Sequence, residues 1–244
     1  KNMTERKMKV EIWSDIMCPF CYIGKRHFES ALKTFDNSGN IDIEWKSFQL
    51  DPTIPEDISA DTTVYGYLAE RKGVSVEQAT QMHEGVMQMA QAAGLTYNFD
   101  IAKVANSMNA HRMIQMAKSK GLGDAAEEKL FQSYFTDGRN FGDTNKIVKM
   151  GLEIGLTEEE VMESLSNDDY AYKVKQDIQE GEKLGVRGVP FFVFDRKYGI
   201  SGAQPIEAFS QTLEQSFAEW SKENPVQKLE IIDGQVCTPD GNCD

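Results

Sequence analysis

Strand patterns occur only towards the two ends of this chain, and a long stretch of helical patterns separates them. Apolar residues alternate with other residues around Val10 and again around Ile43, with the period of two that is typical of a strand. Between these segments, Phe28, Leu32 and Phe35 fall at helical spacing. A helix that connects two strands in this way favours a parallel pair. The N-terminal part therefore predicts a β-α-β unit.

The middle of the chain, residues 61–185, contains helix starts and stops in close succession. Two pairs have the spacing of a capping box, in which each side chain bonds to the other residue's backbone: Ser75 with Gln78, and Thr157 with Glu160. Asp100 is interpreted as the cap of another helix that continues towards Gly121, and Gly185 suits the end of the last helix. We interpret residues 61–185 as a helical insertion domain.

The strand pattern returns after this helical stretch. Phe191–Phe194 is a short apolar run of the kind expected for a strand buried on both faces. A turn around Tyr198 leads to Ile200, which we interpret as part of a hairpin partner, and Pro205 suits the first turn of a final helix. The order β-α-β, helices, β-β-α predicts a discontinuous α/β domain of residues 8–60 and 186–223.

Residues 224–244 form a C-terminal tail with its own pattern. Asp233-Gly234 is a favoured two-residue turn, which predicts a hairpin, and a turn-rich loop between Cys237 and Cys243 follows. These two cysteines are either incidental free thiols or a second redox pair. The second interpretation, which we favour, allows a local disulfide or exchange with Cys18.

The segment Cys18-Pro19-Phe20-Cys21 lies where the first predicted strand gives way to a helix. A cysteine at a helix start faces unpaired backbone N–H groups and the positive end of the helix dipole, which favour its thiolate. Pro19 fits the first turn, because its missing N–H costs nothing there. Cys21 follows three residues later on the same helical face, within reach of a disulfide. We therefore predict that Cys18 attacks a substrate sulfur and that Cys21 resolves the mixed disulfide.

A zinc site is the alternative for these cysteines, because half of a zinc site has the same C-x-x-C spacing. Zinc would use all four cysteines, but the spacing from Cys237 to Cys243 is wider than that of common zinc sites. The position of Cys18 at a helix start is also unexplained by zinc. We therefore favour redox chemistry and predict no metal.

Four segments resemble the FrnE-like branch of the DsbA family, within the thioredoxin superfamily: Ser14–Gly24, Asn106–Arg112, Gly185–Pro190 and Ser201–Gln204. They occur in the same order as the predicted elements. The resemblance implies a thioredoxin-like α/β fold interrupted by a helical insertion domain, with dithiol–disulfide exchange as its activity. It also implies that the Val189–Pro190 peptide bond is cis and lies beside the active-site sulfurs.

Several other residues are candidate neighbours of the cysteines. The resemblance suggests that Asn106 and His111 face the active site, although a lone histidine on a helix is more often a packing residue. Arg187 either faces the same site, where it would stabilise thiolates or a substrate carboxylate, or is a solvated loop residue. Phe20 and Trp13 are predicted to form an apolar rim, with core packing as the alternative for Trp13.

The dipeptide between the cysteines bears on the reduction potential. The better-known periplasmic oxidants of the family carry Pro-His there, whereas this chain carries Pro19-Phe20. A phenylalanine supplies neither a hydrogen-bond donor nor a positive charge to the thiolate, so the reduced form is less favoured. We expect a less oxidising enzyme than those relatives, with a potential shifted by tens of millivolts, since ~30 mV corresponds to ~1.4 kcal/mol.

A different enzyme class is the second hypothesis. Related glutathione-dependent isomerases and transferases, of the 2-hydroxychromene-2-carboxylate isomerase and kappa type, act on small aromatic molecules. They typically carry a serine in place of the first cysteine of the motif. This chain retains both Cys18 and Cys21, which favours the disulfide oxidoreductase.

Composition limits the partners. The formal net charge of -13 argues against nucleic acids and anionic membranes, which require a basic surface. No apolar run is long enough to cross a bilayer and no signal peptide is visible, so we expect a cytoplasmic protein. We expect no bound cofactor, with glutathione as a possible co-substrate. The expected partners are protein thiols and disulfides or small thiols. The sequence specifies no oligomeric state.

Overall fold

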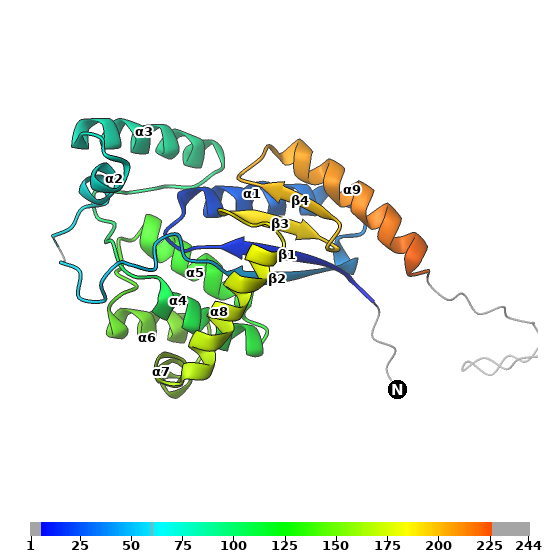
Figure 1. Cartoon of the computed structure of the whole chain (residues 1–244). Helices are drawn as coiled ribbons and strands as arrows, with labels where there is room; N and C mark the ends of the chain where they lie inside the picture. Colours follow the sequence, from blue (N-terminus) through cyan, green and yellow to red (C-terminus); the bar gives the residue numbers. More distant parts are fainter. Residues whose placement is uncertain (1–5, 60, 226–244) are drawn as a thin grey trace, which may run out of the picture.

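The computed structural model describes residues 6–59 and 61–225 (Figure 1). The described residues form a four-stranded sheet in the order β2-β1-β3-β4. Its strands are β1 (Met8–Ser14), β2 (Ile41–Ser47), β3 (Phe191–Phe194) and β4 (Tyr198–Ser201). β1 pairs with β2 in parallel, whereas β3 runs antiparallel to both β1 and β4. The two central strands therefore come from opposite ends of the sequence, as the strand patterns predict.

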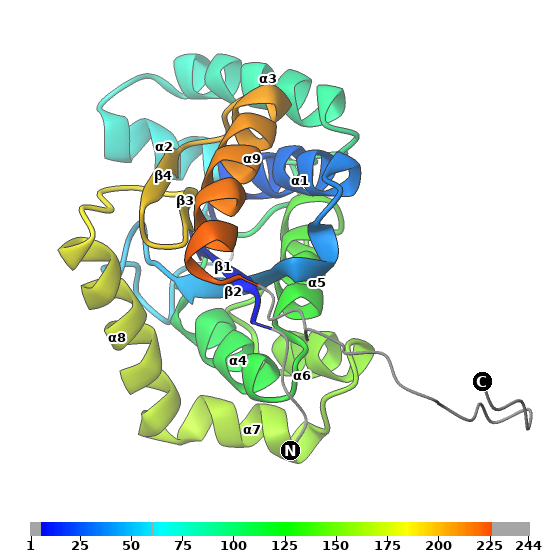
Figure 2. The same cartoon turned by 90° about the vertical axis from the view of Figure 1, so that its right-hand side faces the viewer.

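One face of the sheet is covered by α1 (Pro19–Thr34) and α9 (Ile206–Glu223), which pack against each other (Figures 1 and 2). Phe28 of α1 lies at the centre of this layer. Its ring centroid is 5.7 Å from that of Phe192, 6.1 Å from that of Phe194 and 6.0 Å from that of Phe209. Inclined ring pairs of this kind add to the stabilisation from apolar burial. The position of α1 on the sheet is thereby fixed.

The central part of the chain supplies the remaining helices: α2 (Val64–Lys72), α3 (Val76–Ala92), α4 (Met108–Ser119), α5 (Gly123–Phe135), α6 (Thr144–Glu153), α7 (Glu158–Ser166) and α8 (Asp168–Lys183). They share a second apolar core, which includes Leu130, Phe131 and Phe135. Cys18 and Cys21 belong to this core rather than to the one between the sheet and α9. The cysteines therefore lie where the helical part meets the sheet part.

Helix α8 packs on the other side of the sheet, in contact with β2 (Figure 1). Trp13, near the end of β1, is fully buried there, and its Nε1 donates a hydrogen bond to the backbone oxygen of Asp177 at 2.7 Å. A Cβ atom at Gly181 would lie 2.6 Å from Trp13 Nε1. Since real side chains do not approach so closely, α8 requires glycine at this position to lie against Trp13.

Most of the predicted helix signals are confirmed. Both capping boxes are present, at Ser75 with Gln78 and at Thr157 with Glu160. Gly185, with a φ of 86°, follows the end of α8 in the left-handed conformation that glycine adopts without strain.

The helix predicted from Asp100 is wrong. Residues 102–106 are irregular and α4 begins only at Met108. The Asp100 carboxylate accepts a hydrogen bond from the Tyr65 hydroxyl at 2.8 Å instead of capping a helix. Ala102 and Val104 are buried in the helical core from this irregular segment, so tertiary packing overrides the apolar spacing.

Two predictions from the sequence remain predictions. The C-terminal hairpin and the pair Cys237/Cys243 lie outside the described residues. The division into residues 8–60 with 186–223, and 61–185, is likewise still a prediction.

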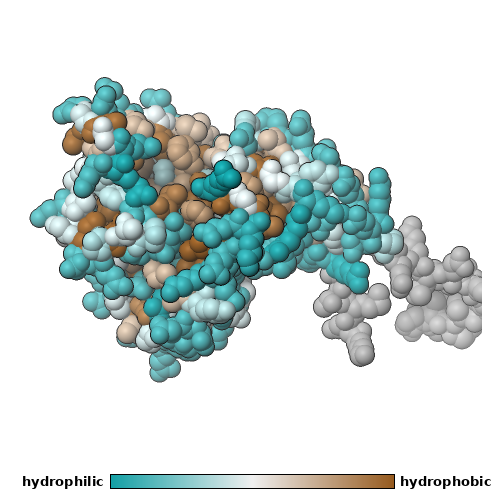
Figure 3. Space-filling model, in the orientation of Figure 1, coloured by the Kyte–Doolittle hydropathy of each residue, from teal (hydrophilic) through white to brown (hydrophobic). Residues whose placement is uncertain are grey.

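The surface carries an apolar area on one side. In Figure 3, hydrophobic side chains gather between α3 and the β3–β4 hairpin. The exposed large apolar side chains include Phe20 of α1 and Met82 and Met89 of α3. Across residues 6–59 and 61–225, no helix combines the length and apolarity needed to cross a membrane.

Candidate active site

Cys18 ends the turn between β1 and α1, and Cys21 lies in the first turn of α1. Cys18 is the N-cap of α1, Pro19 is the first residue of the helix, and the N–H of Cys18 donates to the Asp15 carbonyl at 2.9 Å. Both cysteines are free thiols, with Cys18 3% and Cys21 1% exposed. The prediction that Cys18 lies at a helix start is confirmed.

The Cys18 sulfur is oriented towards the segment before β3. Within the described residues, no backbone N–H of α1 donates a hydrogen bond to this sulfur. The thiol itself donates to the Val189 carbonyl at 3.4 Å. The Val189–Pro190 bond is cis, as the resemblance implied. A Cβ at Gly24 would lie 3.1 Å from Pro190 Cγ, so glycine allows α1 to approach this proline closely. Val189 and Pro190 thus lie where they were predicted.

Cys21 lies one turn into α1 and is enclosed by protein. Burial raises the pKa of its thiol well above the ordinary value, and the hydrogen bond and charge of Cys18 raise it further. The backbone of Asp15 and the hydroxyl of Ser14 hydrogen-bond to Cys21 and lower its pKa, because they stabilise the thiolate. The net direction is upward. Cys21 is therefore a thiol at neutral pH until a group nearby accepts its proton.

The two predicted rim residues differ in the structure. Phe20 is 37% exposed beside Cys18, which suits a rim position. Trp13 is fully buried against Val186 and Val193, so its core-packing alternative is correct and its rim position is wrong. The indole fills the space between the sheet and α8, where it lies against Asp177 and Gly181.

His111 of α4 is buried together with Asp15, three residues before Cys18. Its Nε2 lies 3.3 Å from Asp15 Oδ1, and Asp15 Oδ2 accepts the N–H of Leu50 at 2.7 Å. Burial lowers the pKa of His111, but the hydrogen bond and charge of Asp15 raise it by more, so the net direction is upward. His111 therefore connects the helical part to the active-site turn, which agrees with the packing interpretation of this residue.

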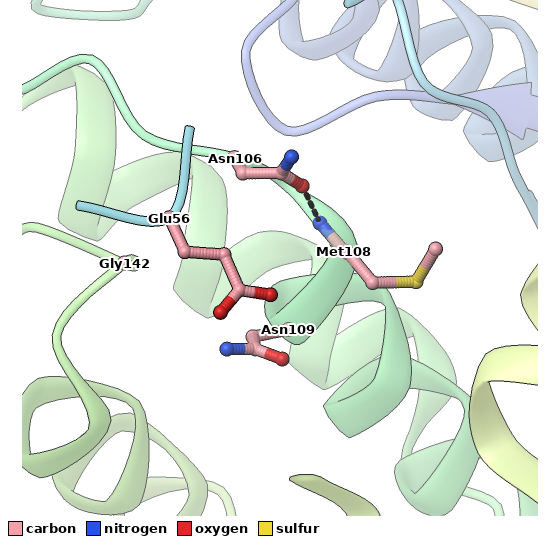
Figure 4. Close-up of a pocket in the computed structure, with 5 residues that line it drawn as sticks. All are labelled: Glu56, Asn106, Met108, Asn109 and Gly142. Carbon is pink, nitrogen blue, oxygen red and sulfur yellow. Dashed lines mark hydrogen bonds between the residues drawn. The ribbon is translucent and has the colours of Figure 1, made fainter. Parts of the chain in front are cut away.

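Asn106 and Arg187 make no hydrogen bond to either cysteine within the described residues. Asn106 lines a small pocket with Glu56, Met108, Asn109 and Gly142 (Figure 4). Its Oδ1 accepts the N–H of Met108 at 2.9 Å, and its Nδ2 donates to the Ile54 carbonyl at 2.8 Å. Asn106 therefore fixes the start of α4 to the loop after β2. Arg187 is exposed, in agreement with the solvated-loop interpretation.

Tyr97 and Glu127, both from the helical part, lie near the cysteines and were missed in the sequence. The Tyr97 hydroxyl donates to the Pro19 carbonyl at 2.7 Å. Glu127 of α5 is 1% exposed, and the Ser14 hydroxyl donates to its Oε2 at 3.5 Å. One signal was available, because Glu127 lies three and four residues before the buried Leu130 and Phe131 and so places a carboxylate on an apolar stripe.

The carboxyl group of Glu127 has an unusual protonation equilibrium. Burial raises its pKa to about 7, although the charges of His111 and Lys25 act in the opposite direction. Its Oε1 has no hydrogen-bond partner among the described residues. A buried carboxylate without full hydrogen bonding favours its neutral form. Glu127 therefore exchanges its proton near neutral pH.

Glu127→Gln is expected to stabilise the protein in a pH-dependent manner. Because the pKa of Glu127 is raised in the folded protein, its contribution to the free energy of unfolding is fully present below about pH 4.5. This contribution is lost as the pH rises through about 7. Relative to wild type, the amide should gain about 2–3 kcal/mol more at pH 8 than at pH 5. Urea unfolding of both proteins at the two pH values measures this, and an equal difference at both would contradict the assignment.

The family follows from comparison with known proteins. Residues 9–214 match the family described as the DSBA-like thioredoxin domain. The chain belongs to this family. The crystal structure of a probable DsbA oxidoreductase from Streptomyces coelicolor is 38% identical, with a TM-score of 0.81 over 97% of this chain and 98% of that chain. The predicted fold class, a thioredoxin-like α/β fold interrupted by helices, is confirmed.

More distant matches include the uncharacterized protein YwbO of Bacillus subtilis (strain 168), which is 23% identical over 206 residues, or 84% of this chain and 94% of that protein. The cytosolic disulfide reductase DsbM from Pseudomonas aeruginosa is 16% identical, with a TM-score of 0.62 over 86% of this chain and 99% of that chain. A 2-hydroxychromene-2-carboxylate isomerase is 13% identical, with a TM-score of 0.60 over 89% and 98%. At these identities, the two structures show the fold alone.

Proposed function

We propose that this DSBA-like protein is a thiol–disulfide oxidoreductase in which Cys18 attacks and Cys21 resolves. The observation that carries the proposal is the pair of free thiols at the start of α1: the backbone N–H of Cys21 donates to the Cys18 carbonyl at 3.0 Å, and the Cys18 thiol donates to the Val189 carbonyl. In the reducing direction, the Cys18 thiolate attacks a substrate disulfide and releases one substrate thiolate. Cys21 then attacks the Cys18 sulfur and releases the second.

The substrates in this proposal are protein dithiols and disulfides, or small thiols such as glutathione. Two features of the surface support protein substrates: Phe20 is exposed beside Cys18, and apolar side chains gather between α3 and the β3–β4 hairpin (Figure 3). DsbM has been solved with GSH, which supports glutathione as a co-substrate. Its cytosolic location supports a cytoplasmic location here. We also propose that the protein belongs to the FrnE-like branch of the family and that Cys237 and Cys243 are a second redox pair.

A glutathione-dependent isomerase is the second candidate. The structural likeness to 2-hydroxychromene-2-carboxylate isomerase favours it. Such a reaction forms and breaks a bond between glutathione and a small aromatic molecule and leaves no use for a resolving cysteine. The presence of Cys21, whose backbone N–H donates to the Cys18 carbonyl at 3.0 Å, therefore favours disulfide exchange.

Two parallel assays separate these candidates. The wild-type protein is tested for insulin reduction with glutathione as the reductant and for oxidative refolding of a reduced disulfide protein. The same preparation is tested for glutathione-dependent isomerisation of 2-hydroxychromene-2-carboxylate. We expect catalysis in at least one disulfide assay and none in the isomerase assay. Isomerisation without disulfide exchange would replace the proposal by the second candidate.

A further inference from the structure

Asp15, three residues before Cys18, holds the active-site turn from the inside of the molecule. Its backbone carbonyl accepts the N–H of Cys18 at 2.9 Å, and its Oδ1 accepts the N–H of Met17 at 3.4 Å. The other carboxylate oxygen, Oδ2, accepts the N–H of Leu50, in the loop after β2, at 2.7 Å. A buried carboxylate therefore lies against the same short turn that ends at the attacking cysteine.

His111 of α4 supplies an opposite charge to this carboxylate. Asp15 and His111 are both 0% exposed, and His111 Nε2 lies 3.3 Å from Asp15 Oδ1. The other ring nitrogen, Nδ1, has no hydrogen-bond partner among residues 6–59 and 61–225. A buried charge is costly unless an opposite charge lies beside it, and removal of one partner leaves the other uncompensated. The contact thus couples a residue of α4 to the turn before α1.

We propose that the positive charge of His111 keeps Cys18 reactive, because it compensates the charge of Asp15 behind the active-site turn. This inference rests on the proposed function, since it concerns the attack of Cys18 on a substrate disulfide. Within the described residues, no hydrogen bond joins His111 to either cysteine sulfur, so His111 acts through Asp15. It is therefore a positioning residue.

The electrostatic reason lies in the thiolate that attacks. The thiolate of Cys18 is negative, and a second, uncompensated negative charge against the same turn would oppose its formation. Such repulsion is stronger inside a protein than in water, because little solvent screens it. When His111 is protonated, the pair of Asp15 and His111 is neutral as a whole, and Cys18 ionises without this repulsion. Phe20, between the two cysteines, has no charge with which to take over this role.

The groups around His111 agree with a cation at this position. Burial lowers the pKa of His111, but the hydrogen bond and charge of Asp15 and the charge of Glu127 on α5 raise it by more. Glu127 is the weaker partner, because its own pKa of about 7 leaves it partly neutral at neutral pH. On α8, which also packs against α4, Asp177 forms an ion pair with Lys118 instead. Asp15 is therefore the main anionic partner of His111.

Alkylation of Cys18 in the reduced full-length protein measures this effect. Iodoacetamide is an uncharged reagent that reacts with the thiolate, and mass spectrometry follows the labelling of Cys18 from pH 4 to pH 10. His111→Gln retains a hydrogen-bond donor for Asp15 but removes the charge. We expect the pH of half-maximal labelling to rise by about one pH unit, which means about tenfold less thiolate on the acidic side of the profile.

Asp15→Asn, added to His111→Gln, separates charge from structure. It removes the negative charge that needs compensation, its amide oxygen still accepts the N–H of Leu50, and its NH₂ group faces the new amide oxygen at position 111. We expect this double variant to label Cys18 with the wild-type pH profile. If His111→Gln does not fold, the double variant should still fold, because it buries no unpaired charge at this place. A purely structural role of His111 predicts the opposite, since the two substitutions would then add their damage.

His83→Gln is the matched control. His83 of α3 is also a buried histidine, at 9% exposed, but its Nδ1 bonds to the Ala79 carbonyl of its own helix and its ring packs against Phe99. Its replacement should leave the labelling profile of Cys18 unchanged. A shift as large as that of His111→Gln would show that the loss of any buried histidine has this effect, and the inference would fail.

The outcomes separate this inference from the proposed function. If His111→Gln labels Cys18 with the wild-type profile, or if the double variant is no closer to wild type than His111→Gln, the inference is wrong and the oxidoreductase proposal stands. Insulin reduction and oxidative refolding by the wild-type protein are measured in parallel. If the wild-type protein catalyses neither, the proposed function fails, and the role of His111 in the attack of Cys18 fails with it.

Discussion

Cys18→Ser is expected to lower the rate of insulin reduction by at least about 1,000-fold, since loss of a covalent nucleophile has cost other enzymes up to about 10⁶-fold. The thiolate is the attacking species in disulfide exchange, and a serine hydroxyl neither ionises at neutral pH nor forms a disulfide. Serine is close in size to cysteine and retains a donor for the Val189 carbonyl, which Cys18 contacts at 3.4 Å. The loss should therefore be chemical rather than structural.

Cys21→Ser is the informative comparison for this variant. It retains the attacking thiol, so it should accumulate a mixed disulfide with the substrate at Cys18, whereas Cys18→Ser should accumulate none. Circular dichroism and thermal unfolding check that both variants are folded. A Cys18→Ser protein that retains more than about a tenth of the wild-type rate would show that Cys18 is not the nucleophile, because a factor of ten corresponds to only about 1.4 kcal/mol of barrier.

Trp13→Ala is expected to lower the free energy of unfolding by about 3–5 kcal/mol, the usual cost of truncating a buried aromatic side chain. The Trp13 indole is fully buried, and its Nε1 donates to the Asp177 carbonyl at 2.7 Å. Gly181 lies so close that no side chain there would fit beside the ring. Removal of the ring leaves a cavity between the sheet and α8 and removes the hydrogen bond from the indole to the Asp177 carbonyl.

Tyr172→Ala is the matched control for this prediction. Tyr172 lies on the same helix α8 but is 62% exposed, so its truncation should change the free energy of unfolding by no more than about 0.5 kcal/mol. Urea unfolding measures both variants under the same conditions. If Trp13→Ala lost activity with stability unchanged, Trp13 would belong to the active site and not to the core.

The parts of the fold that could be predicted are those set by local patterns. Strand periods around Val10 and Ile43, the capping boxes and the C-x-x-C motif each depend on a few neighbouring residues. The placement of Val189 and Pro190 beside Cys18 depended on the family resemblance, because no local pattern joins residues so far apart in the sequence. The structure agrees with each of these predictions.

The parts that could not be predicted depend on long-range packing. The spacing after Asp100 is compatible with a helix, but the Tyr65 hydroxyl takes the carboxylate that would have capped it. Glu127 became part of the site only because α5 packs beside the end of β1, where Ser14 meets its carboxylate. Neither contact has a signature in a single sequence.

The central claim is that Cys18 and Cys21 are a reversible redox pair, and equilibration with glutathione buffers tests it most directly. The protein is brought to equilibrium at a series of ratios of reduced to oxidised glutathione, its free thiols are blocked, and its disulfides are mapped by mass spectrometry. We predict one transition between two free thiols and a Cys18–Cys21 disulfide. Because Phe20 offers the thiolate no donor, its potential should be more negative than the about -120 mV of the strong oxidant DsbA. Absence of a Cys18–Cys21 disulfide at every ratio would contradict the account.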